Sequence, residues 1–109
     1  MTPVYYDPAL RHRIAKMKER LVAAISLAVQ APSGHNTQPW LFRVLSDGVE
    51  LYADRSRSLP VVDPDDRELV ISCGAALHHL QLAMHCDGLA TCLRLTPSMD
   101  EPDLLARVI

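Results

Sequence analysis

Apolar residues recur every three or four positions along residues 8–31, the spacing of one face of an α-helix. The stripe consists of Leu10, Ile14, Met17, Leu21, Ile25 and Ala28. Asp7 and Pro8 suit a helix start, because a carboxylate can accept hydrogen bonds from free backbone N–H groups and Pro fits the first helical position. Pro32 cannot continue the hydrogen-bond ladder, so the pattern predicts a helix over 8–31.

Two short β-prone runs follow at 41–45 and 49–53, separated by Ser46-Asp47-Gly48. Because Asp-Gly suits the positive φ angles of a tight turn, these runs predict a hairpin. Residues 54–66 are rich in turn formers and lack any period, which predicts a long loop. A loop of this length in a small domain is usually functional or mobile.

A second helix is predicted from Asp63-Pro64 to about Asp87, with Gly88 as a left-handed stop. Its apolar stripe consists of Leu69, Cys73, Ala76, Leu77, Leu80 and Met84. Residues 91–95 have the composition of a strand.

The segment from Ser98 to Glu101 fits a capping box, which predicts a last helix. That helix would bury Leu104, Leu105 and Val108. The order helix, hairpin, helix, strand, helix predicts an α+β fold, arranged like an α/β sandwich, with helices packed on a small sheet. We expect one domain over residues 1–109. An apolar last turn at the end of the chain suggests an incomplete, partial domain.

Composition and charge exclude several classes of protein. Hydrophobic residues make up 49% of the 109 positions, and the net charge is −2, which disfavours a broadly basic nucleic-acid binder. The local excess of three positive charges over residues 1–30 is best explained by a solvated helix face. Apolar runs stop well short of the roughly 20 residues of a membrane span. No secretory signal pattern and no C-x-x-C spacing occur, so we expect a cytoplasmic protein without membrane or nucleic-acid contacts.

Polar side chains are densest over residues 31–40, where the first helix ends. They belong to Ser33, His35, Asn36, Thr37 and Gln38. Gly34 is expected to allow an unusual backbone angle, while Trp40 anchors the segment from the core side. Such a rigid corner can hydrogen-bond a planar polar ligand. A well-capped loop beside a buried Trp would explain the same residues without a ligand.

Other chemistry is poorly supported by the sequence. Ser33 and His35 lack the Gly-x-Ser-x-Gly context of a nucleophile elbow. His78 and His85 are seven positions apart, so the four-residue spacing of helical metal ligands is missing. Cys73 falls on the apolar stripe and is interpreted as a core residue. We therefore assign no catalytic and no metal-binding residue.

The segment APSGHNTQPW resembles the Pro-Ser-x-x-Asn-x-Gln-Pro-Trp segment of the FMN-dependent nitroreductase superfamily. CGAALHHLQLAMHCDGLATCLRL resembles that family's later helix and strand, and ELYADRSRSLPVVDPDDRELVISCGAAL is similar to its Acg-like branch. The resemblance covers about residues 25–108. It implies a flavin ring and ribityl chain bound beside Pro32, Ser33, Gly34, His35, Asn36 and Gln38.

Within that set, Asn36 matches a fixed motif position and is the candidate for a direct flavin contact. Gln38 and Trp40 are expected to support the loop, and His35 occupies a variable position. The family's early phosphate-binding arginines would fall near residues 4–7, where this sequence has none. Arg55 and Arg57 in the long loop could bind an anion instead, or be solvated loop charges.

The resemblance implies an oxidoreductase that moves electrons from NAD(P)H through FMN to a nitroaromatic or quinone-like acceptor. In the family this segment lies at a subunit interface, so a homodimer is expected. The predicted strands are too short to cover the apolar stripes of both helices, and the uncovered apolar surface favours the same expectation. Two alternatives remain: a flavin-sequestering or regulatory protein without turnover, and a structural half-domain that only dimerises.

Overall fold

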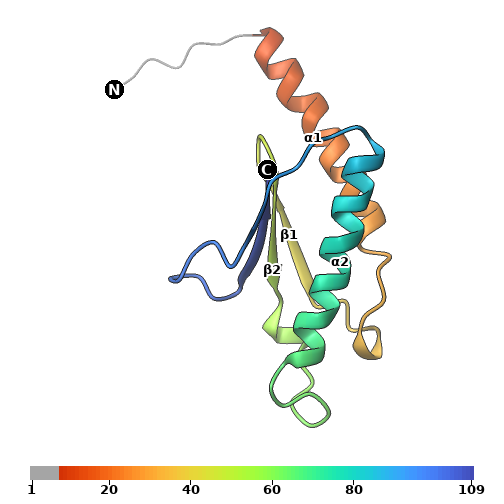
Figure 1. Ribbon diagram of the computed structural model, residues 1–109, viewed down its shortest axis with the longest axis vertical. Coiled ribbons are helices and arrows are strands. Elements are labelled where there is room, and N and C mark those ends of the chain that lie inside the picture. The colour runs from red at the N-terminus through yellow and green to blue at the C-terminus, as the bar shows by residue number, and fades with distance from the viewer. Residues whose placement is uncertain (1–7) are drawn as a thin grey trace.

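Two helices pack against one face of a four-stranded antiparallel sheet in the computed structural model, which describes residues 8–109 (Figure 1). The long helices are α1 (Pro8–Ala28) and α2 (Arg67–Cys86). The strands are β1 (Trp40–Val44), β2 (Val49–Ala53), β3 (Leu93–Leu95) and β4 (Leu104–Val108), in the sheet order β1-β2-β4-β3. Two short 3-10 helices are η1 (Gly34–Asn36) and η2 (Arg55–Arg57). The predicted α+β class and the hairpin are confirmed.

The last element is a strand, so the helix predicted after Ser98 is wrong. Leu104, Ala106 and Val108 are buried, whereas Leu105 is only partly buried, which is the two-residue alternation of a strand. β4 pairs with β2 on one side and with β3 on the other. Hydrogen bonding to two neighbours therefore decided the conformation of an apolar run too short to distinguish helix from strand.

The first helix ends at Ala28, three residues before the predicted end, and Asp7 lies outside the described residues. Only the C-terminal part of its apolar stripe is buried, at Leu21 and Ala28. Leu10 is 51% exposed, so its predicted burial is wrong. The reason is visible in Figure 1, where the first turns of α1 project beyond the sheet and beyond α2.

The second helix starts at Arg67, a few residues later than the sequence pattern predicted. Asp63 is buried, and its carboxylate accepts hydrogen bonds from the backbone N–H groups of Glu68 (3.2 Å) and Leu69 (3.0 Å). The predicted capping role of Asp63 is therefore confirmed. Gly88, at φ +80°, ends the helix in the left-handed conformation predicted for it.

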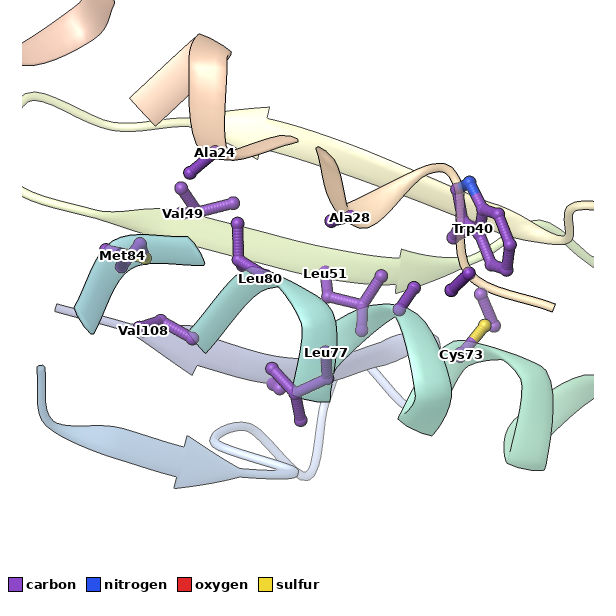
Figure 2. Close-up of a cluster of buried hydrophobic side chains, with 14 of the residues drawn as sticks. Ala24, Ala28, Trp40, Val49, Leu51, Cys73, Leu77, Leu80, Met84 and Val108 are labelled. Carbon is purple, nitrogen blue, oxygen red and sulfur yellow. The ribbon is translucent and has the colours of Figure 1, made fainter. Parts of the chain in front are cut away.

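The hydrophobic core lies between the two helices and the sheet (Figure 2). Trp40 at the start of β1 is 7% exposed, and Cys73 of α2 is 1% exposed, so both are core residues as predicted. Side chains from α1, α2, β2 and β4 meet here. Besides Trp40 and Cys73, Figure 2 labels Ala24, Ala28, Val49, Leu51, Leu77, Leu80, Met84 and Val108. Burial of this layer is the main driving force for the fold.

Helix α2 is long and apolar enough, by length and composition alone, to cross a membrane, with a mean hydropathy of 1.2. The sequence pattern had not predicted a segment of that kind. Seven residues of α2 are buried, including Leu69, Cys73 and Leu80. Packing in the core therefore accounts for the apolar residues on the buried face of this helix, whereas Val70, Ile71 and Leu82 are exposed.

Candidate functional site

The connection between α1 and β1 has an unusual backbone. His35 (φ 51°), Asn36 (φ 54°) and Gln38 (φ 49°) all lie in the left-handed region. Gly34 does not, so the expectation that Gly34 carries the unusual angle is wrong. Left-handed angles at residues other than glycine cost of order 1 kcal/mol each and persist only where the surroundings enforce them. We call residues 33–38 the corner.

The corner is held in place by hydrogen bonds from α2 and from within itself. The backbone N–H of Gly34 donates to Oγ of Ser72 (3.0 Å), a buried residue of α2. Inside the corner, the backbone N–H of Gln38 donates to Oγ of Ser33, and the hydroxyl of Thr37 donates to the carbonyl of Gly34, both at 3.0 Å. These bonds account for the stability of the strained backbone.

Sequence reasoning missed Ser72. The available signal was a hydroxyl residue beside the apolar stripe of α2, directly before the buried Cys73. The thiol of Cys73 donates to the carbonyl oxygen of Pro39 at 3.4 Å, so two consecutive α2 residues bond to Gly34 in the corner and to Pro39 directly after it. Burial raises the pKa of the Cys73 thiol to about 11, which keeps it protonated at neutral pH.

Position 34 lies close to a side chain of α2. A Cβ atom there would lie 3.1 Å from Oε2 of Glu68. An added methyl group would therefore require the Glu68 side chain to shift. Glu68 is a second α2 residue that sequence reasoning did not connect with the corner.

The corner presents amide groups to solvent. Asn36 and Gln38 are exposed, and Nε2 of Gln38 donates to Oδ1 of Asn36 at 3.4 Å. Within residues 8–109, the side-chain amide nitrogen of Asn36 donates to no protein acceptor. The corner therefore offers a positioned hydrogen-bond donor at its surface.

An apolar cleft of about 360 Å³ opens beside the corner. It is lined by His35 and by the four consecutive residues Leu59, Pro60, Val61 and Val62. Val61 is 91% exposed, so this wall presents apolar surface directly to solvent. The volume lies within the range of small-molecule sites. An apolar wall next to amide donors suits a flat ring with polar edges.

Arg55 and Arg57 are engaged within the fold, which argues against their use as an anion site. The Arg55 guanidinium donates to Asp103 (2.9 Å) and Asp66 (3.0 Å), and the hydrogen bond to Asp103 is the main reason that its pKa is raised. Arg57 lies 3.3 Å from a carboxylate oxygen of Asp54 and donates to the carbonyl of Thr37 at 3.1 Å. These arginines link the long loop to its surroundings and to the corner.

No group of three or more His, Cys, Asp or Glu residues that could hold a metal ion occurs between residues 8 and 109. The described site therefore consists of a strained polar corner, an apolar wall and the α2 residues that support them. This arrangement is a candidate small-molecule site on an α+β scaffold.

Several similar proteins carry names that assign them to the NAD(P)H nitroreductases. The chain is 48% identical over 66 residues to "Putative NAD(P)H nitroreductase Rv3131" of Mycobacterium tuberculosis, covering 61% of this chain and 19% of that protein. It is 36% identical over 86 residues to "Putative NAD(P)H nitroreductase acg" of the same organism, covering 79% of this chain and 26% of that protein. "Probable NAD(P)H nitroreductase PigM" of a Serratia species is 33% identical over 73 residues, or 65% of this chain and 20% of that protein.

The resemblance to the Acg-like nitroreductases is thereby confirmed for the matched part of the chain. The chain spans about a fifth to a quarter of the length of these relatives. No protein-family model matches it. Two helices on a four-stranded antiparallel sheet fit a nitroreductase-like fold as a part of it.

Proposed function

We propose that the chain forms one wall of an FMN site in a nitroreductase-type oxidoreductase, which passes electrons from NAD(P)H to a nitroaromatic or quinone-like acceptor. The observation that carries this proposal is the corner, where three left-handed residues in four positions are held by α2 beside an apolar cleft. Strain of this kind concentrates at ligand sites. The relatives' names supply the reaction class.

The described residues suit the ring and ribityl parts of FMN better than its phosphate. The ring of a flavin needs an apolar wall and hydrogen-bond donors at its polar edges, which Leu59–Val62 and Asn36 provide. A phosphate needs cationic or clustered N–H donors. Arg55 and Arg57 are already paired within the fold, so the phosphate would depend on groups outside these loops.

FMN, when bound, supplies the redox chemistry, and the residues of this chain position it. Asn36 would donate its side-chain amide to the polar edge of the ring, and the hydrogen bond between Ser33 and Gln38 fixes the backbone from which Asn36 projects. Pro32 precedes the corner, and Gly34 brings the backbone of the corner close to α2. His35 and the apolar wall exclude water from one face of the ring.

A homodimer in the cytoplasm is part of the same proposal. Exposed apolar residues on α1, among them Leu10, Val22 and Leu27, are suited to burial against a second copy. The three cysteines are free thiols, which suits a reducing compartment. Sedimentation of the purified chain at micromolar concentration tests the dimer, and a monodisperse monomer near 12 kDa would contradict it.

Flavin titration tests the site. Substituting Asn36→Ala removes one neutral hydrogen bond, typically about 0.5–1.5 kcal/mol, so FMN affinity should fall roughly 2- to 13-fold. Gln30→Ala is the matched control, because Gln30 bears an exposed side-chain amide shortly before the corner, and among the described residues this amide donates to the carbonyl of Ser26 alone. Quenching of flavin fluorescence measures both variants.

Riboflavin and FMN should bind the 109-residue chain with similar weak affinity, because the phosphate finds no free arginine in the long loop. A strong preference for FMN would contradict this account of the loop arginines. Absence of any flavin binding would favour the structural half-domain. Bound flavin that NADPH does not bleach in the longer protein would favour a sequestering or regulatory role.

A further inference from the structure

A single row of charged side chains crosses all four strands. The register places Arg43 of β1 opposite Glu50 of β2, Glu50 opposite Arg107 of β4, and Arg107 opposite Arg94 of β3. Because side chains alternate along a strand, all four lie on the face opposite the helices. We call this face the outer face.

Charges in this row are balanced at one end and unbalanced at the other. Glu50 is 4% exposed. Its carboxylate accepts hydrogen bonds from Nε (3.1 Å) and a terminal nitrogen (2.7 Å) of Arg107. It also accepts a hydrogen bond from the Tyr52 hydroxyl at 3.4 Å and lies 3.9 Å from the guanidinium of Arg43. The hydrogen bond to Glu50 raises the pKa of Arg107.

Arg94 has no such partner. No described carboxylate lies within ion-pairing distance of it, and its cross-strand neighbour is Arg107, a like charge. Glu101 also acts on the charge of Arg107 from the loop before β4, but forms no ion pair with either arginine among the described residues. Like charges directly opposite each other destabilise a sheet. The four residues of the row carry a net charge of +2.

The outer face also carries apolar surface on both sides of the row. Leu41 of β1 is 53% exposed on one side of the row, and Ile109, which follows β4, is 42% exposed on the other side. Both long helices lie on the other side of the sheet (Figure 1). Apolar residues around a fixed cationic row form a surface that polypeptide, rather than water alone, would cover.

We propose that the outer face binds an acidic amphipathic polypeptide segment, which places a carboxylate between Arg94 and Arg107 and its apolar residues on Leu41 and Ile109. Charge complementarity selects this occupant, because the row has one carboxylate for three guanidinium groups. Arginine holds carboxylates with paired, directional hydrogen bonds. This inference is independent of the flavin site.

Arg94→Glu separates a binding role from a structural one. In the isolated chain the new carboxylate faces Arg107 and removes a repulsion, so the midpoint of thermal unfolding should rise by about 2–5 °C. Binding of an acidic segment should instead weaken about tenfold, because the variant presents a like charge to it. Arg13→Glu is the matched control, with the same change of net charge on an exposed position of α1.

The probe is a fluorescein-labelled helical peptide of 16 residues with a leucine face flanked by glutamates, compared with the same peptide carrying glutamine in place of glutamate. Fluorescence anisotropy should show the 109-residue chain binding the glutamate peptide at least tenfold more tightly. That preference should shrink with added salt and disappear in Arg94→Glu. It should persist in Arg13→Glu.

Five results would overturn the proposal. Equal binding of both peptides would mean that the carboxylates of the peptide are not recognised. An equal loss of peptide affinity in Arg13→Glu would mean a nonspecific charge effect. A lower unfolding midpoint in Arg94→Glu would make Arg94 structural. Tighter Arg94-dependent binding of a ten-nucleotide oligothymidylate, or Arg94-dependent self-association in light scattering, would assign the face to nucleic acid or to a second copy.

Discussion

The pairing of β2 with β4 and the corner at residues 33–38 are stabilised in opposite ways. In the strands the backbone is extended, neighbouring strands satisfy its hydrogen bonds, and Val49, Leu51 and Val108 are buried. In the corner three residues adopt strained angles, much of the surface is exposed, and support comes from side chains of α2. Regular structure supports itself, whereas a strained site depends on a rigid neighbour.

Helix α2 joins the two regions. Cys73 and Ser72 are consecutive, one packed in the core and the other hydrogen-bonded to the corner. Any change that shifts α2 on the sheet should therefore alter the corner, while changes within the corner should leave the core intact. Substitutions in each region test this asymmetry.

Trp40→Ala should have the largest effect, because Trp40 is buried where the corner meets β1. Removing a large buried aromatic side chain typically costs about 3–5 kcal/mol of the free energy of unfolding. Urea unfolding followed by circular dichroism measures the loss. An almost unchanged midpoint would mean that the corner is not anchored to the core through Trp40.

Gly48→Ala should cost about 3 kcal/mol, because the new Cβ would lie 2.1 Å from the carbonyl oxygen of Val108 and force β2 and β4 apart. Gly74→Ala is the control. Its Cβ would meet nothing within 4 Å, and alanine favours a helix, so this variant should gain about 0.5–1 kcal/mol. Similar effects of the two substitutions would contradict the close contact at the hairpin.

Alkaline pH should destabilise the fold through Cys73. Burial raises its pKa from 9.0 to about 11 in the folded chain, so the unfolded thiol ionises first as the pH rises. The stabilising contribution is complete below pH 9 and is lost between about pH 9 and 11, which amounts to about 2 kcal/mol at pH 10.5. Cys73→Ala should lack this part of the pH dependence. Equal alkaline loss in both proteins would refute it.

Ser72→Ala should cost about 1–2 kcal/mol, because the N–H of Gly34 loses its acceptor. Ser26→Ala on the exposed side of α1 is the control and should stay within about 0.5 kcal/mol. Flavin affinity should fall in Ser72→Ala and not in Ser26→Ala. Unchanged affinity in Ser72→Ala would mean that the corner keeps its shape without α2.

Local sequence patterns determined both long helices, the hairpin, the capping by Asp63 and the stop at Gly88. Each of these depends on contacts between residues close in the chain, which periodicity and turn chemistry record directly. The polar corner was also found from its composition and motif, because its chemistry is concentrated in six consecutive residues.

Tertiary structure decided the rest. Residues 104–108 became a strand because β2 and β3 offer backbone partners on both sides, and no local signal reports such partners. Arg55 and Arg57 form ion pairs with Asp103, Asp66 and Asp54, which argues against their use in binding an anion. Of these three carboxylates, only Asp54 is a near neighbour in sequence.

The left-handed angles of the corner follow the same logic. Sequence assigned the unusual backbone to Gly34, where it costs least, whereas the structure places it at His35, Asn36 and Gln38. A non-glycine residue holds such an angle only when distant groups enforce it. One of the hydrogen bonds that hold the corner comes from Ser72, 38 positions away from Gly34, and this bond depends on how α2 packs against the sheet.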